Sequence, residues 1–209
     1  MKSIKKYIIA ASLLILITGY SNSAKAQLFW LGATGGATYS WFTSPKVDNV
    51  LTSDGWGWDF GIFVRYGKRP FIQMGADWTW SMNEITFTNG QSGDIAFQDT
   101  VKFNNFDFSA KIGYELFQSP MFKIKAQAGP FIGKSLLFST EGISFSNKDF
   151  VNPQFGIVSG LGFQFTNLVV DFEYKYNFTN LFKPVDIDGV PVKLGSKLQM
   201  ITLKVGIMF

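Results

Sequence analysis

The 209-residue chain contains no cysteine and no histidine. Without cysteine there is no disulfide framework, thiolate nucleophile or cysteine-ligated zinc site, and no cysteine to carry a lipoprotein anchor. Without histidine the chain lacks the usual general base, the commonest metal ligand and any Ser-His-Asp triad. These absences predict a protein that is not an enzyme and that has no catalytic residues, no cofactor-binding residues and no metal site.

One catalytic alternative survives these absences, a pair of carboxylates of the kind used in acid–base hydrolysis. Asp186 and Asp188 are the nearest candidates. However, an Asp-Gly step is also the preferred centre of a two-residue β-hairpin turn, and Asp188 is followed by Gly189. The hairpin turn is the favoured interpretation.

A long apolar run is also missing. After residue 26 no apolar stretch comes close to the roughly 20 residues that a membrane-spanning helix needs. The chain begins with Lys2, Lys5 and Lys6, continues with an apolar stretch at 7–17, and then carries the small-x-small step Ala24-Lys25-Ala26. This order is typical of a secretory signal peptide. The apolar stretch is short for the alternative, a membrane anchor. We expect a cleaved signal at 1–26, a mature domain at 27–209, and export.

An excess of charge of one sign is lacking as well. The expected signal holds four of the 19 lysines and arginines and no acid, so the remainder has 15 basic and 15 acidic residues. A nucleic-acid-binding surface needs lysine and arginine in surplus on one face. The balance therefore predicts that nucleic acid is not a partner.

Aromatic residues, in contrast, are abundant, with 23 Phe, 7 Tyr and 6 Trp. In segment 168–178 apolar and aromatic residues alternate with a mostly charged set, as in a strand with two different faces. A half-buried strand of a soluble protein alternates too. The aromatic content exceeds what one small core can bury, which favours a strand with its apolar face in lipid and its polar face in a barrel lumen.

Seven further segments repeat this alternation, each over about 11 residues, the length of a tilted membrane strand. The connections between the segments are alternately short, at 67–70, 117–120 and 166–167, and long. The pattern predicts an all-β fold, an eight-stranded antiparallel up-and-down transmembrane β-barrel with long extracellular hairpin loops and short periplasmic turns. The eight expected strands are 29–41, 56–66, 72–82, 106–116, 122–132, 155–165, 168–178 and 201–209.

The residues between the outward positions must face the lumen, and they include six acids and six bases. An eight-stranded barrel is only wide enough for side chains to fill, and confined charges are costly unless paired. We therefore expect a structural, self-neutralising network in a plugged lumen. The alternative is a narrow channel for small solutes, although an ion-selective pore would rather show a ring of one sign. The expected network comprises Asp59, Arg65, Asp77, Asp107, Lys111, Glu115, Lys123, Lys125, Asp171, Glu173, Lys175 and Lys204.

Two long connections, 83–105 and 134–152, contain apolar residues in strand-turn-strand order. This order predicts stiff hairpins above the membrane, whose apolar residues either bind a protein partner by packing or strand addition, or cover one another. The candidate partner-binding residues are Ile85, Phe87, Ile95, Phe97, Leu137, Phe138, Ile143 and Phe145.

Together, the Ala26-Gln27 cleavage site, the eight-strand pattern and the terminal Phe209 resemble the small outer-membrane β-barrels of the Bacteroidota, the PorT-like or outer membrane β-barrel domain proteins. The resemblance implies a structural or accessory protein of a Gram-negative outer membrane. Its expected partners are outer-membrane lipid, an outer-membrane or surface protein, and the barrel-assembly machinery. Some PorT-like proteins belong to a secretion machine, so a place in a larger complex is implied too. The expected C-terminal assembly signal comprises Leu203, Val205, Ile207 and Phe209.

Overall fold

The computed structural model describes residues 28–43, 50–88, 95–140, 150–181, 183, 185–187, 190–192 and 197–209. The expected signal peptide and its cleavage site lie outside these residues. The described chain forms ten strands: β1 Phe29–Thr43, β2 Val50–Gly67, β3 Phe71–Thr88, β4 Ile95–Gln118, β5 Phe122–Thr140, β6 Gln154–Phe165, β7 Leu168–Asn177, β8 Val185–Ile187, β9 Val190–Val192 and β10 Lys197–Met208.

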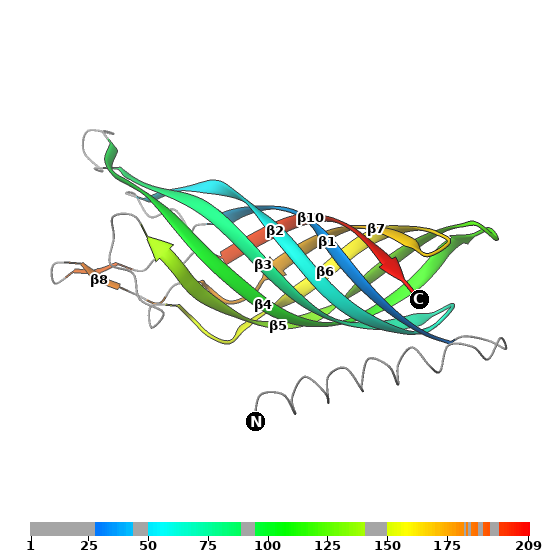
Figure 1. Cartoon of the computed structure of the whole chain (residues 1–209). Helices are drawn as coiled ribbons and strands as arrows, with labels where there is room; N and C mark the ends of the chain where they lie inside the picture. Colours follow the sequence, from blue (N-terminus) through cyan, green and yellow to red (C-terminus); the bar gives the residue numbers. More distant parts are fainter. Residues whose placement is uncertain are drawn as a thin grey trace, which may run out of the picture.

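Eight of these strands close into one antiparallel barrel in the order β1-β10-β7-β6-β5-β4-β3-β2 (Figure 1). The first and last strands close the barrel, with Ala37 paired to Leu203 and Ala33 to Ile207. The start of β1 and the C-terminus lie at the same end of the barrel as the short turns, which we call the turn end; the long connections define the loop end (Figure 1). The predicted fold class is confirmed.

The predicted alternation between two faces is also confirmed. Outward residues remain exposed, with 57% of Trp58, 68% of Ile112 and 51% of Leu203 accessible, whereas Asp59 and Lys204 beside them in sequence are buried. An apolar exterior around a charged interior is the arrangement expected when the outer face meets lipid. Among the described residues there is no helix with the length and hydropathy needed to cross a membrane.

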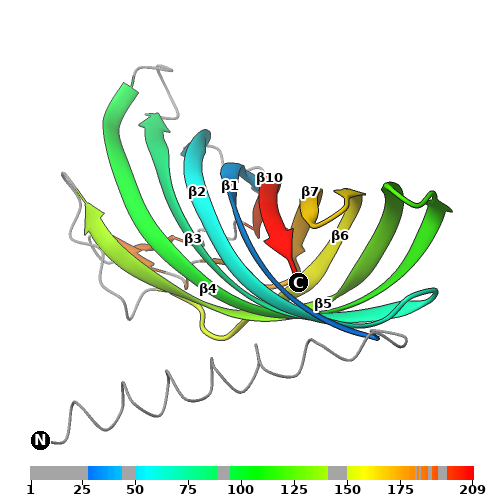
Figure 2. The ribbon, with the colours of Figure 1, turned by 45° about the vertical axis from the view of Figure 1, so that its right-hand side comes forward.

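The strands on one side of the barrel are longer than the eight predicted membrane segments, because they continue without a break into the hairpin predicted in 83–105. β4 has 24 residues and begins at Ile95 rather than 106, and β3 runs to Thr88 rather than 82. β2 begins at Val50, and β5 ends at Thr140. The band of exposed apolar residues around the barrel exterior is called here the apolar belt. Backbone pairing continues past this belt because each strand still has a neighbour with which to form hydrogen bonds, as in the pair Phe87 and Phe97. Figure 2 shows the ends of β3 and β4 projecting well beyond β6, β7 and β10. We call 50–54, 83–88, 95–105 and 135–140 the overhanging sheet.

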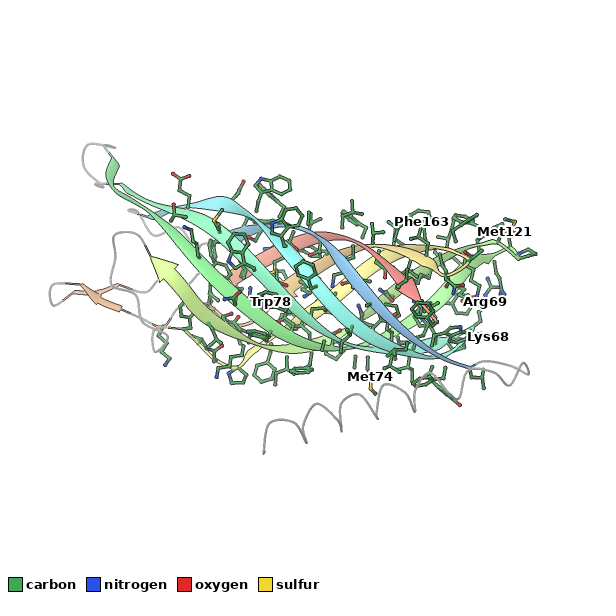
Figure 3. All side chains as sticks on the ribbon, viewed as in Figure 1. Lys68, Arg69, Met74, Trp78, Met121 and Phe163 are labelled. Atoms are coloured by element: carbon green, nitrogen blue, oxygen red, sulfur yellow. The ribbon has the colours of Figure 1, made fainter. Side chains whose placement is uncertain are left out.

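Smaller boundaries also differ from prediction. The second short turn lies at 119–121, not 117–120, because an irregularity between Glu115 and Phe117 lets β4 continue to Gln118. This bulge leaves both Leu116 and Phe117 more than half exposed. β7 ends at Asn177, so Phe178 falls outside it, and β10 already begins at Lys197. Lys68 and Arg69 mark the first turn, at the turn end (Figure 3).

A separate two-stranded hairpin, β8 and β9, lies at the loop end (Figure 1). Val185 pairs with Val192 and Ile187 with Val190, which leaves two residues for the connection. The hairpin expected from Asp188-Gly189 is therefore confirmed by the pairing of its strands, while those two residues lie outside the described part of the chain.

Candidate functional site

The barrel interior collects the charged residues that the sequence assigns to the lumen. Of the twelve, eleven are buried, and Lys123, near the turn end, is half-buried with 22% of its side chain accessible. They come from six strands, β2, β3, β4, β5, β7 and β10, because period-two alternation brings every second residue of each strand to the same side. The resulting ion pairs form two groups at different depths.

The central group is built around two lysines. The Nζ atom of Lys175 lies 2.9 Å from Asp107 Oδ2 and 3.6 Å from Asp77 Oδ2. Lys204 reaches Asp77 Oδ1 at 2.7 Å, Asp59 Oδ1 at 2.8 Å and Glu173 Oε2 at 3.1 Å. Five strands, β2, β3, β4, β7 and β10, thus contribute to the contacts around these two lysines. Each ammonium offers three donors, so a lysine can satisfy several carboxylates at once and bind the strands across the lumen.

Neighbouring polar groups complete the central group. Lys111 forms an ion pair with Glu173, whose Oε1 atom also accepts a hydrogen bond from Gln127 Nε2 at 3.1 Å. The hydroxyl of Thr79 donates to Asp59 Oδ2 at 2.6 Å. Buried charges are tolerated only when such partners replace the lost hydration.

The second group lies toward the turn end. Lys125 approaches Asp171 Oδ1 at 2.8 Å, and Lys123 approaches Glu115 Oε1 at 3.2 Å. Arg65 donates from Nε and Nη2 to Gln73 Oε1 at 3.1 and 2.9 Å. These contacts join β2 to β3, β4 to β5 and β5 to β7.

An apolar layer lies beside this second group at the turn end. Phe63, Val169 and Met208 form a buried cluster against which Trp30 packs. Phe71 is also buried, and its ring centre lies 4.4 Å from the Arg65 guanidinium carbon. A guanidinium over an aromatic face is a favourable cation–π contact. This apolar layer therefore covers the charged interior and also stabilises the buried guanidinium of Arg65.

A second apolar layer lies at the loop end. Phe103 is fully buried, and its ring centre is 6.4 Å from that of Phe42. Two residues from outside the barrel strands, Phe150 and Leu181, are also buried, and the backbone N–H of Val151 donates to the Leu181 carbonyl at 2.9 Å. The remaining buried apolar residues of the inner faces of β5, β6 and β10 toward this end are Phe131, Val158, Leu198 and Met200.

Two interior cavities lie beside the charged groups, and each holds about 10 Å³. One water molecule needs about that much room. In the part of the chain that the structure describes, the charged groups therefore lie between two apolar layers, and each of these two cavities has space for about one water.

The candidate partner-binding residues lie outside the barrel interior, where the strands project beyond the barrel at the loop end. Ile85 and Phe87 belong to β3, Ile95 and Phe97 to β4, and Leu137 and Phe138 to β5, all within the overhanging sheet. Ile143 and Phe145 fall outside the described residues. The first predicted hairpin is confirmed in its backbone; the second is described only on its β5 side, where Val101 pairs with Thr140.

The expected assembly signal lies on the outer face of β10. Leu203, Val205 and Ile207 are about half exposed, and Phe209 is 60% exposed at the turn end. Phe209 and Leu31 exchange two backbone hydrogen bonds of 2.8 and 2.9 Å, so the last residue completes the closing pair of strands.

The structure describes only the backbone of one member of the alternative carboxylate pair. Asp186 lies in β8 opposite Pro191, and Asp188 is outside the described residues. Within the described ranges no group of three or more acidic side chains is arranged so that it could hold a metal ion.

Sequence reasoning missed the two apolar layers. The inward parity of the charged residues is shared by Phe63, Phe103 and Phe131, so alternation could have identified these three as buried. The prediction of the lumen considered charged residues only. Phe150 and Leu181 lie in connections, where no periodicity marks a buried residue.

Comparison with known proteins places the chain by family. None of the curated proteins matches it. Among solved structures, Neisserial surface protein A is similar at 14% identity (88% of this chain, 99% of that one, TM-score 0.48), and OprG from Pseudomonas aeruginosa at 12% (87% and 95%, TM-score 0.49). Ail of Yersinia pestis, solved with the heparin analogue sucrose octasulfate, is similar at 14% (87% and 99%, TM-score 0.42). The family model of the outer membrane protein beta-barrel domain matches residues 12–209, and the chain belongs to this family.

Proposed function

We propose that this chain is a non-conducting outer-membrane barrel with a structural or accessory role, and that its overhanging sheet binds a protein partner outside the membrane. The observation that carries the proposal is the length of β4. About 11 tilted residues cross a membrane, yet β4 has 24; it is paired with β3 from Ile95 to Gly113 and with β5 from Val101 to Gln118. Its residues 95–105, which belong to the overhanging sheet, are therefore available for a task outside the lipid.

The interior supports the non-conducting part of the proposal. Ion pairs occupy the centre, and apolar layers lie on either side of them. A narrow channel for small solutes, the alternative function, would need a continuous polar path, whereas the interior cavities beside the charges have room for about one water each.

The family and the sequence support a location for the protein. Export through a signal at 1–26 and residence in a Gram-negative outer membrane are part of the proposal, with the loop end outside. The resemblance to PorT-like proteins adds a more specific form of the same role, in which the barrel is a subunit of a secretion or assembly complex.

Site-specific photo-crosslinking in cells tests partner binding. A photoreactive amino acid at Phe87 or Phe97, which pair in the overhanging sheet, is expected to give a crosslinked species larger than the barrel. The matched control is Met121, which is 59% exposed at the turn end and should give none. Absence of crosslinks at both positions, with native extraction yielding only single barrels, would overturn the proposal.

Planar-bilayer recording tests the closed interior separately. The purified barrel is expected to be silent. Stepwise conductance whose ion selectivity changes in Lys125→Glu or Asp171→Lys would instead establish the channel.

A further inference from the structure

The lipid-facing surface of the barrel contains a groove of about 450 Å³ that crosses β1 to β4. Its floor is one row of paired outward residues, Ala33, Ile62, Ala76 and Phe108, and the two alanines leave this row low on either side of Ile62. The next row toward the loop end, Phe60, Trp78 and Phe106, forms its wall. The groove opens outward, into the apolar belt, and is distinct from the interior cavities.

The aromatic wall is a continuous stack. The ring centres of Phe60 and Trp78 are 6.0 Å apart with planes at 29°, and those of Trp78 and Phe106 are 6.4 Å apart with planes at 12°. The indole N–H of Trp78 donates to Asn104 Oδ1 at 3.0 Å, which fixes the middle ring. Figure 3 shows Trp78 on the outer side of the barrel. The groove therefore has a pre-formed wall rather than a set of independent side chains.

Strand register gives the groove a direction. Along the wall, Phe60 pairs with Trp78, Trp78 with Phe106, and Phe106 with Lys134 of β5. Lys134 is exposed and is the first charged outward residue after Ile132. At the other end, Ala33 lies within the apolar stretch 29–41 of β1. The groove thus rises obliquely from the middle of the apolar belt to the edge of the belt at the loop end, where Lys134 lies.

The groove stays within one leaflet. Neighbouring strands are about 4.8 Å apart, so the path from β1 to β4 is about 14 Å long. Because strands of such barrels are tilted by about 40°, this oblique path rises by about 9 Å, which is less than half of the roughly 30 Å hydrocarbon core of a bilayer.

We propose that this groove binds one acyl chain of a phosphate-bearing lipid in the leaflet at the loop end, with the phosphate beside Lys134. Hydrocarbon surrounds the barrel everywhere, so burial alone does not select a lipid here. Selection comes from close packing against rigid rings and from the attraction between an ammonium and a phosphate at the rim. The apolar groove and the lysine are arranged in the order in which a lipid carries its tail and its phosphate.

Native mass spectrometry of the folded, full-length barrel tests the proposal, with dioleoyl phosphatidylglycerol and dioleoyl phosphatidylcholine as probes. The wild type is expected to retain one phosphatidylglycerol through detergent removal. Ala76→Phe fills the floor and should reduce retention of both lipids about tenfold. The matched control, Ala128→Phe, adds the same ring at an exposed outward position of β5 and should retain lipid as the wild type does.

The charge requirement is tested by Lys134→Gln, which should remove the preference for phosphatidylglycerol over phosphatidylcholine while leaving tail binding. Each variant is first shown to be folded by its heat-dependent electrophoretic mobility; if Ala76→Phe does not fold, Ala76→Leu replaces it. Equal lipid retention in the Ala76 variant and the Ala128 control would overturn the proposal that the groove binds the acyl chain. An unchanged lipid preference in Lys134→Gln would overturn the phosphate site.

Discussion

The ring of Phe71 occupies the space that a side chain at Gly113 would need. These residues are paired across β3 and β4, and a Cβ atom placed on Gly113 would lie 2.1 Å from Phe71 Cζ. The same relationship recurs at Gly32, where a Cβ atom would lie 2.3 Å from Phe63 Cζ. The large inward side chains of the turn end are therefore accommodated by glycines on the neighbouring strands.

Replacing Gly113 should consequently be costly. Gly113→Val is expected to destabilise the barrel by about 3 kcal/mol or more, because Phe71 is held against Arg65 and has little room to turn. The measurement is urea unfolding in lipid vesicles, followed by tryptophan fluorescence.

Gly75→Ala is the matched control for that experiment. Gly75 lies on the inner face of β3, but its nearest neighbour, Ser109 Oγ, is 3.4 Å from the added Cβ atom, an ordinary contact. A change of less than about 0.5 kcal/mol is expected. Equal stability of Gly113→Val and Gly75→Ala would contradict the packing described for the turn end.

Removal of a central lysine should expose the interdependence of the interior charges. Lys175→Met leaves Asp107, 2.9 Å away, as a buried carboxylate without its ion pair, and is expected to cost about 3–5 kcal/mol. Adding Asp107→Asn should recover part of this loss, because the orphaned charge is then gone. Lys68→Met, at an exposed position in the first turn, should leave the unfolding free energy unchanged. A double variant no more stable than Lys175→Met alone would argue against the pairing.

The loop-end layer makes a different prediction, since it is built by phenylalanines that differ from the lipid-facing ones in parity and not in residue type. Phe103 is fully buried, whereas Phe172 is 46% exposed on the outer face of β7. Phe103→Ala should cost about 3–5 kcal/mol through the cavity it leaves. Phe172→Ala should cost much less, because lipid chains fill the vacated space. Similar losses in urea unfolding for the two variants would mean that Phe103 is not a core residue.

These contrasts show what the sequence could predict. Lipid on one side and a narrow lumen on the other force a strict alternation, so the face of Trp58 or Asp59 can be read from parity alone. Strand ends follow less directly. The apolar residues of 83–105 predicted the hairpin strand that starts at Ile95, but the end of β4 at Gln118 rather than 116 depends on the bulge in its pairing with β5. Likewise, burial of Phe150 and Leu181 is decided by contacts between connections far apart in the chain.

Phe209 offers a test that separates structure from assembly. Its backbone exchanges two hydrogen bonds with Leu31, while its side chain is 60% exposed on the outside. Phe209→Ala keeps the backbone bonds and removes only an exposed ring, so the unfolding free energy of the refolded barrel should change by less than about 0.5 kcal/mol. If the ring is read by the barrel-assembly machinery, the amount of folded protein in outer membranes should nevertheless fall several-fold. Deleting Phe209 removes the backbone bonds too, each worth about 1 kcal/mol, and should lower stability as well. Normal outer-membrane levels of Phe209→Ala would show that the last residue closes the barrel but is not a signal, because its structural contribution resides in the backbone.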